Sequence, residues 1–141
     1  MFKKKIKKGN EEKIHNKNIL IAALLIHAAK IDDNYTSVEK EIIKKALISL
    51  FAIEPDETEE LLKKAEKIEQ ESNQIVAFTR EIKKNSMEFR LKIIEILWKI
   101  VYSDGSNNTY ESNLIRRVCG LLYISDRDSG MIKLKVKNLS K

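Results

Sequence analysis

VYSDGSNNTYESNLI, residues 101–115, is an acidic and polar stretch set between two apolar segments. Residues 29–43 read AKIDDNYTSVEKEII and repeat its pattern, with Asp32 standing 72 positions before Asp104. Self-similarity at a fixed offset is typical of a duplicated structural unit. The sequence therefore predicts an internal duplicated helix-loop-helix.

The first copy starts with a strongly apolar segment. Residues 19–29 are apolar on nearly every helical face, which is typical of a helix that is buried on all sides. After the acidic stretch, Thr36-Ser37-Val38-Glu39 has the form of a capping box, in which the first and last side chains each accept from the other's backbone amide. Apolar residues then recur at three- and four-residue spacing and predict a helix with one buried face. They are Val38, Ile42, Ile43, Ala46, Leu47, Leu50 and Phe51.

The second copy and the segments around it also read as helices. Residues 87–101 are a second heavily apolar segment, and Asn108-Thr109-Tyr110-Glu111 repeats the capping box. Pro55 and the acidic residues after it start an outer helix, residues 75–83 form a short one, and residues 126–136 form the last. No segment alternates as a strand would. We expect an all-α fold, a single helical bundle of about seven helices.

The charge is unevenly distributed along the chain. The net charge is +6, yet residues 1–8 carry five lysines without an acid and residues 131–141 carry four, which leaves −3 for the middle. Nucleic-acid binding would need positive charge on the folded surface, so we expect no nucleic-acid partner. We predict a basic flexible tail at residues 1–15, a helical domain at 16–137 and a short tail at 138–141. The basic tail is either solvated or in peripheral contact with an anionic membrane.

The remaining sequence features favour a cytoplasmic protein. A single cysteine, Cys119, excludes an internal disulfide, and no signal peptide is recognisable. The longest apolar run, residues 19–26, is shorter than the ~20 residues that span a bilayer. Cys119 and Trp98 fall at core positions, and His27 is expected to be partly buried with a local partner.

Catalytic arrangements are excluded by residue content. The chain has two histidines and one core cysteine, so neither a Ser/His/Asp nor a Cys/His site can be assembled. Its four glycines are too scattered for a phosphate-binding loop. We expect the protein not to be an enzyme.

The two acidic loops are the candidate metal sites. Their oxygen-rich side chains are of the kind that hard divalent cations prefer. The candidate ligands are Asp32, Asp33, Glu39, Asp104 and Glu111. An ordinary EF-hand is excluded, because isoleucine (Ile43 and Ile115) stands where its bidentate glutamate is required. In the other interpretation the glutamates cap their own helices and the aspartates form turns, and both interpretations remain open.

The duplicated pattern resembles the TerB family of tellurite-resistance proteins, whose domain also forms the N-terminal part of some membrane-anchored J-domain co-chaperones. The matching segments span about residues 19–136. They are Ala22-Ala23-Leu24-Leu25 through Asp32-Asp33 to Glu39 and Ile43, Phe78-Thr79-Arg80, Leu97-Trp98 through Asp104-Gly105 to Glu111 and Ile115, and Leu122 with Ile124-Ser125. One difference is Asp33, where the family usually has glycine.

The resemblance implies a non-catalytic helical domain with an acidic surface that has been associated with metal binding. It also implies a role as a scaffold or sensor in protein assemblies that answer tellurite, metal-oxyanion and other stresses. The expected place is the cytoplasm or the inner face of the membrane, with a protein partner that is itself membrane-associated. The sequence specifies neither the oligomeric state nor a cofactor beyond the divalent cation considered above.

Overall fold

The computed structural model describes the backbone of residues 2–31, 35–72, 74–103 and 109–139, with their side chains except those of residues 2–15 and 109–111. Within these ranges every regular element is a helix, as the sequence predicts. The helices are α1 (Phe2–Lys30), α2 (Ser37–Phe51), α3 (Pro55–Glu71), α4 (Ile75–Lys83), α5 (Met87–Tyr102), α6 (Thr109–Leu121) and α7 (Asp126–Leu139). None of the helices in this described part is long and apolar enough to cross a membrane.

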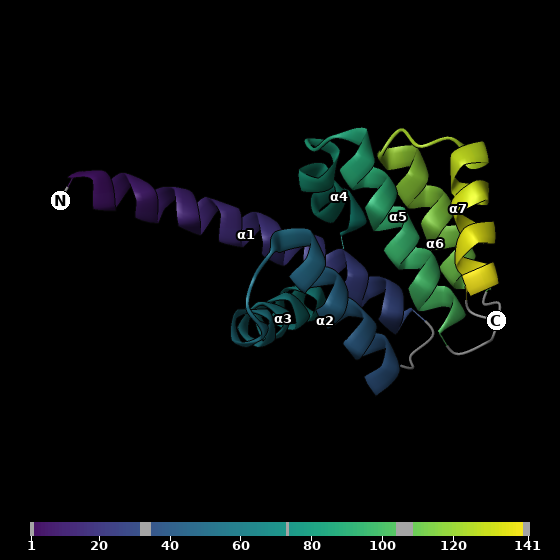
Figure 1. The fold of residues 1–141 in the computed structure, drawn as a ribbon, viewed down its shortest axis with the longest axis horizontal. Coiled ribbons are helices and arrows are strands. Elements are labelled where there is room, and N and C mark those ends of the chain that lie inside the picture. Colours follow the sequence, from purple (N-terminus) through teal and green to yellow (C-terminus); the bar gives the residue numbers. More distant parts are fainter. Residues whose placement is uncertain (1, 32–34, 73, 104–108, 140–141) are drawn as a thin grey trace.

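Two helices form the centre of the bundle (Figure 1). The C-terminal half of α1 packs against α2, α3, α4 and α5, while α5 packs against α1, α2, α4, α6 and α7. Residues 21–26 of α1 are completely enclosed. This confirms burial on all sides for the middle of the apolar segment at residues 19–29, while Leu20 and His27 within it are partly buried.

The described helix ends agree with a duplication. Helix α1 ends at Lys30 and α5 ends at Tyr102, a difference of 72 residues. Helix α2 begins at Ser37 and α6 begins at Thr109, again 72 residues apart. Residues related by this offset share their burial as well, since Leu25, Leu97, Ile43, Ile115, Leu47 and Cys119 are all buried.

The first predicted capping box is present. The Glu39 backbone N–H donates to Thr36 Oγ1 at 3.1 Å, and the Thr36 N–H donates to Glu39 Oε1 at 2.9 Å. Its predicted copy begins at Asn108, which lies outside the described residues, although α6 does begin at the next residue. Ser86 and Ser125 cap α5 and α7 through their hydroxyl groups.

Helix α7 is fixed to the second half of the molecule by Trp98 and Ser129. The Trp98 indole N–H donates to Ser129 Oγ at 3.2 Å, and both residues are buried. Trp98 and Cys119 therefore occupy the core positions that the sequence predicts. A buried indole needs such a partner for its donor.

Helices include both ends of the described chain. Helix α1 begins at Phe2, within the segment predicted as a tail, and its N-terminal part extends beyond the bundle (Figure 1). Lysine and glutamate are good helix formers and no proline interrupts the segment, so the helix can continue outward from its buried half. Helix α7 likewise ends at Leu139, beyond the expected boundary at residue 137. The division into tails and domain at residues 15 and 137 stays a prediction.

Candidate functional site

Of the predicted metal ligands, the structure describes one side chain. Asp32, Asp33 and Asp104 lie outside the described residues, and Glu111 belongs to α6 but its side chain is not among those described. Glu39 is 1% exposed, and its carboxylate accepts hydrogen bonds from both the amide and the hydroxyl of Thr36. The described geometry of Glu39 is therefore that of a helix cap. The metal-site prediction for the other four residues stays a prediction.

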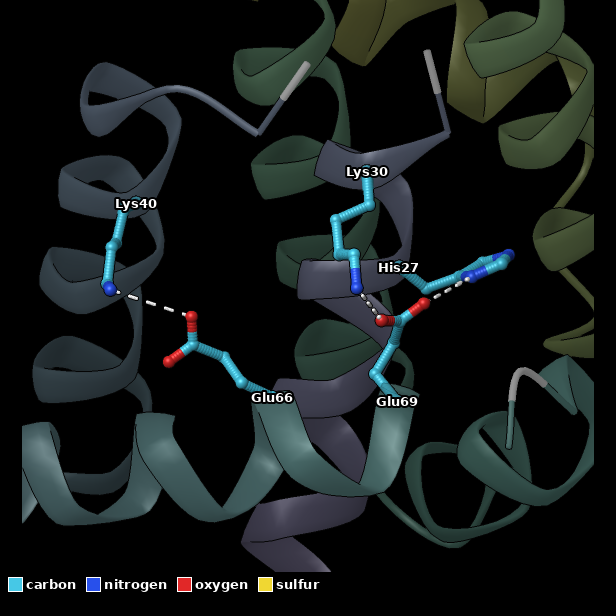
Figure 2. Close-up of polar contacts among 5 residues, drawn as sticks. All are labelled: His27, Lys30, Lys40, Glu66 and Glu69. Carbon is cyan, nitrogen blue, oxygen red and sulfur yellow. Dashed lines mark hydrogen bonds and ion pairs between the residues drawn. The ribbon is translucent and has the colours of Figure 1, made fainter. Parts of the chain in front are cut away.

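A polar cluster lies where α1, α2 and α3 meet (Figure 2). We call it the inter-helix polar cluster. Its members are His27 and Lys30 of α1, Lys40 of α2, and Glu66 and Glu69 of α3.

Glu69 is the most enclosed residue of this cluster, at 7% exposure. Lys30 Nζ donates to Glu69 Oε2 at 2.7 Å, while His27 Nδ1 lies 3.3 Å from Glu69 Oε1 (Figure 2). Both basic residues belong to the last turn of α1, where the helix dipole favours positive charge. The buried carboxylate thus joins the end of α1 to α3. His27 is partly buried, as predicted, but its partner is not local in the sequence, because Glu69 lies 42 positions further along the chain.

The second contact of the cluster joins α2 to α3. Lys40 Nζ lies 3.5 Å from Glu66 Oε2, and one helical turn further along α2, Lys44 forms an ion pair with Glu59. These side chains are partly exposed, so each ion pair adds little free energy by itself. Together the contacts hold α3 against both helices of the first copy.

Tyr35 precedes Thr36 of the capping box and lies close enough to the glutamates of the cluster and of the cap to be influenced by their charge. Burial raises the pKa of its hydroxyl, and the carboxylates of Glu66, Glu39 and Glu69 raise it further. A phenol with a raised pKa stays protonated at neutral pH, so Tyr35 adds no negative charge beside these three glutamates.

Glu66 and Glu69 are not among the site residues predicted from the sequence. Glu69 follows Leu62 and Ala65 at helical spacing, which places it within the buried stripe of α3. A glutamate at a buried position needs a basic partner, so the sequence pattern of α3 alone could have marked Glu69 as a residue with such a partner. The identity of that partner could not be predicted, because His27 and Lys30 lie about forty positions earlier in the chain.

The inter-helix polar cluster is suited to holding helices together and not to binding a metal ion. Its carboxylates face basic side chains, an arrangement that holds helices together. Among the residues with described side chains, no three histidine, cysteine, aspartate or glutamate residues come together as a metal site would require. Cys119 lies in the core, where burial raises the pKa of its thiol and leaves it unreactive.

Comparison with known proteins gives one positive result. A family model described as tellurite resistance protein TerB matches residues 18–134. The matched residues run from α1 into α7 and include both helix-loop-helix copies. No curated protein and no solved structure matches the chain.

Proposed function

The chain belongs to the TerB family of tellurite resistance proteins, and from this membership we propose that it is a non-catalytic interaction module. It would act as a scaffold or sensor in a stress-response assembly of the tellurite or metal-oxyanion resistance type. We further propose a protein partner that is associated with the membrane, and a cytoplasmic location that includes the periphery of the inner membrane.

The main support for this proposal is how the buried polar groups are used. Glu69 joins α1 to α3, Glu39 caps α2, and Ser129 accepts from Trp98 of the core. Each of these groups is engaged in holding helices in place. Glu69 also lines a pocket of about 270 Å³ with Lys30 and Gln70, but both of its carboxylate oxygens already contact the basic side chains of α1. A molecule of this kind acts through its surface.

Growth under tellurite, combined with cross-linking in cells, tests the proposal. We expect cells that lack the chain to grow poorly with tellurite and the wild-type chain to restore growth. We also expect one protein to be cross-linked reproducibly to the wild-type chain and absent from a sample that carries the destabilised variant Leu97→Ala. Normal growth without the chain, together with the absence of such a protein, would contradict the proposal.

The alternative function is a divalent-cation sensor that uses the two acidic loops. The two loops follow buried helices that end 72 residues apart, so the candidate ligands stand at equivalent sequence positions of the two copies. The engagement of Glu39 by Thr36 weakens this alternative, because a ligand must release its hydrogen bonds before it can bind a cation.

Isothermal titration with Ca²⁺, Mg²⁺ and Zn²⁺ separates the two functions. The wild-type chain is compared with a variant that carries Asp104→Ala and Glu111→Ala. For an interaction module we expect no heat of binding from either protein. Heat from the wild type that disappears in the variant would favour the sensor.

A further inference from the structure

A groove with an apolar floor runs between α2 and α5. It encloses about 320 Å³. Its floor consists of Ile42, Ala46 and Leu50 from α2 and Ile96 from α5, and Lys45, Lys92, Lys99, Glu95 and Ser49 form its rim. The three floor residues of α2 are only partly buried, although they belong to the predicted buried face of this helix. The bundle therefore leaves part of an apolar helix face uncovered.

The rim of this groove is positively charged. Lys45, Lys92 and Lys99 are exposed, and within the described side chains none of them forms an ion pair. Glu95 is the single acidic rim residue, and its carboxylate is engaged by Lys135 of α7 at 3.1 Å. An occupant would meet apolar side chains in the middle and unpaired ammonium groups at the sides.

We propose that the α2–α5 groove binds an acidic amphipathic helix of a partner protein. This proposal rests on the proposed function and names the class of partner that the interaction module takes. Apolar side chains at i, i+3, i+4 and i+7 of the incoming helix pack on the floor, as in other helix-in-groove complexes. Glutamate or aspartate residues on both flanks of that helix face Lys45, Lys92 and Lys99.

The spacing of the lysines favours a helix over a fatty acid or a lipid. Lys92 and Lys99 are seven residues apart on α5, which separates them by about 10 Å along the helix axis. A fatty acid or lipid carries its charge at one end, so it would pair with either Lys92 or Lys99 and leave the other lysine unpaired. An incoming helix with acidic residues at i and i+7 reaches both, because its repeat has the same length.

The experiment uses a synthetic peptide as the probe. It is a fluorescent helical peptide of about 14 residues, with leucine on one face and glutamate on both flanks. A control peptide keeps the leucines and carries lysine in place of glutamate. Fluorescence anisotropy with the full chain should show saturable binding of the acidic peptide, weakened by salt, and at least about tenfold weaker binding of the lysine peptide.

Three variants locate the binding surface. Lys92→Glu/Lys99→Glu should weaken binding of the acidic peptide about tenfold or more. Ala46→Gln places a longer uncharged side chain on the floor and should weaken binding without a change in charge. Arg116→Glu/Arg117→Glu makes the same change in net charge on exposed positions of α6 and should bind as the wild type does. Circular dichroism and thermal unfolding establish that each variant is folded.

The opposite results overturn the proposal. They are no binding of the acidic peptide to the wild-type chain, equal binding of both peptides, or groove variants that bind as tightly as the wild type. Two further measurements examine other occupants. Saturable binding of oleate that displaces the peptide would assign the groove to a lipid, and self-association that Lys92→Glu/Lys99→Glu abolishes would assign it to a second copy of the chain.

Failure of the groove proposal can be told apart from failure of the proposed function. If the cellular partner is cross-linked equally well to the wild-type chain and to Lys92→Glu/Lys99→Glu, the module acts through another surface and only the groove proposal is wrong. If no partner is found and growth with tellurite does not depend on the chain, the proposed function itself is wrong.

Discussion

Thr36 and Glu39 show how one pair of side chains starts a helix and encloses a charge. The threonine hydroxyl accepts from the Glu39 amide, and the glutamate carboxylate accepts from the Thr36 amide and hydroxyl. Each group supplies the partner that the other needs at the start of α2. These reciprocal hydrogen bonds explain how Glu39 can be only 1% exposed although it carries a carboxylate.

Removing the Thr36 hydroxyl should destabilise the fold. We expect Thr36→Ala to lower the free energy of unfolding by about 1 kcal/mol, because the Glu39 amide loses its acceptor. Thr36→Ser keeps the hydroxyl and should lie within about 0.5 kcal/mol of the wild type. Urea unfolding followed by circular dichroism measures both values. Equal stability of Thr36→Ala and the wild type would show that the cap contributes nothing.

Tyr35 should make stability depend on alkaline pH. Folding raises the pKa of its hydroxyl above the ordinary value of 10.0, chiefly through burial, so the folded chain holds this proton more tightly than the unfolded chain does. Above about pH 10 the unfolded chain loses the proton first, and stability therefore falls as pH rises. Tyr35→Phe has no such proton, so its stability should fall less between about pH 9 and about pH 11.

Urea unfolding at both pH values measures this difference, and comparing the change within each protein removes any offset that the substitution causes at neutral pH. The exposed Tyr123 serves as the control, because Lys83 lowers the pKa of its hydroxyl. Tyr123→Phe should not reduce the alkaline loss. An equal loss in Tyr35→Phe and the wild type would contradict the assignment.

The individual residues differ in how far sequence alone could place them. Glu39 was predictable as a cap, because the cap depends on residues three positions apart. Glu69 was not identified as a site residue, since its importance depends on His27 and Lys30, which only the packing of α1 on α3 brings close. Sequence patterns of a few residues predict contacts between neighbours in the chain. The contacts of the inter-helix polar cluster join residues that are far apart in the sequence.

At the scale of helices, α1 and α5 have equivalent roles. Each ends before an acidic loop, and each packs against four or more other helices of the described bundle. Leu25 and Leu97 lie at equivalent positions on these helices and are fully enclosed. Both copies thus contribute one central helix and one helix that covers it.

Truncation of either central leucine should therefore have a similar and large effect. We expect Leu25→Ala and Leu97→Ala each to lower the free energy of unfolding by about 2–5 kcal/mol, because each leaves a cavity in close-packed surroundings. Leu134→Ala, on a residue of α7 that is 60% exposed, should change it by less than about 0.5 kcal/mol. Thermal and urea unfolding compare the three variants. A loss below about 1 kcal/mol in either central variant would contradict the equivalence.

Helix starts were more predictable than the outer ends of the chain. Thr36, Pro55 and Ser86 mark starts by a chemical rule, and the structure begins helices directly after or at them. Residues 1–8 contain neither proline nor a serine, threonine, aspartate or asparagine that could cap a helix, and their run of lysines predicts a tail. Helix α1 includes that run because its buried half is continuous with it.

For the molecule as a whole, the five lysines of residues 1–8 are the feature that could bring it to a membrane. They belong to the part of α1 that extends beyond the bundle (Figure 1). Each lysine near an anionic surface contributes up to ~1 kcal/mol, and salt screens this attraction.

Vesicle sedimentation tests this contact. We expect the chain to sediment with vesicles that contain about 30% phosphatidylserine at low salt and to be released at about 0.5 M salt. Replacing the five lysines by glutamine should remove most of the binding, whereas Arg116→Gln/Arg117→Gln should retain it. Equal binding to neutral phosphatidylcholine vesicles would show that the lysines do not direct the chain to an anionic surface.

The order of the helices along the chain also matters while the protein is being made. The fully enclosed residues 21–26 belong to the first helix, yet one of the helices that encloses them, α5, begins only at Met87. Translation at ~5–20 residues per second therefore leaves this apolar segment incompletely covered for roughly 3–12 s before α5 begins to be made. During that interval the nascent chain exposes an apolar segment to chaperones and to other nascent chains. Slow translation would therefore raise the risk of aggregation more for this protein than for one whose central helix is made last.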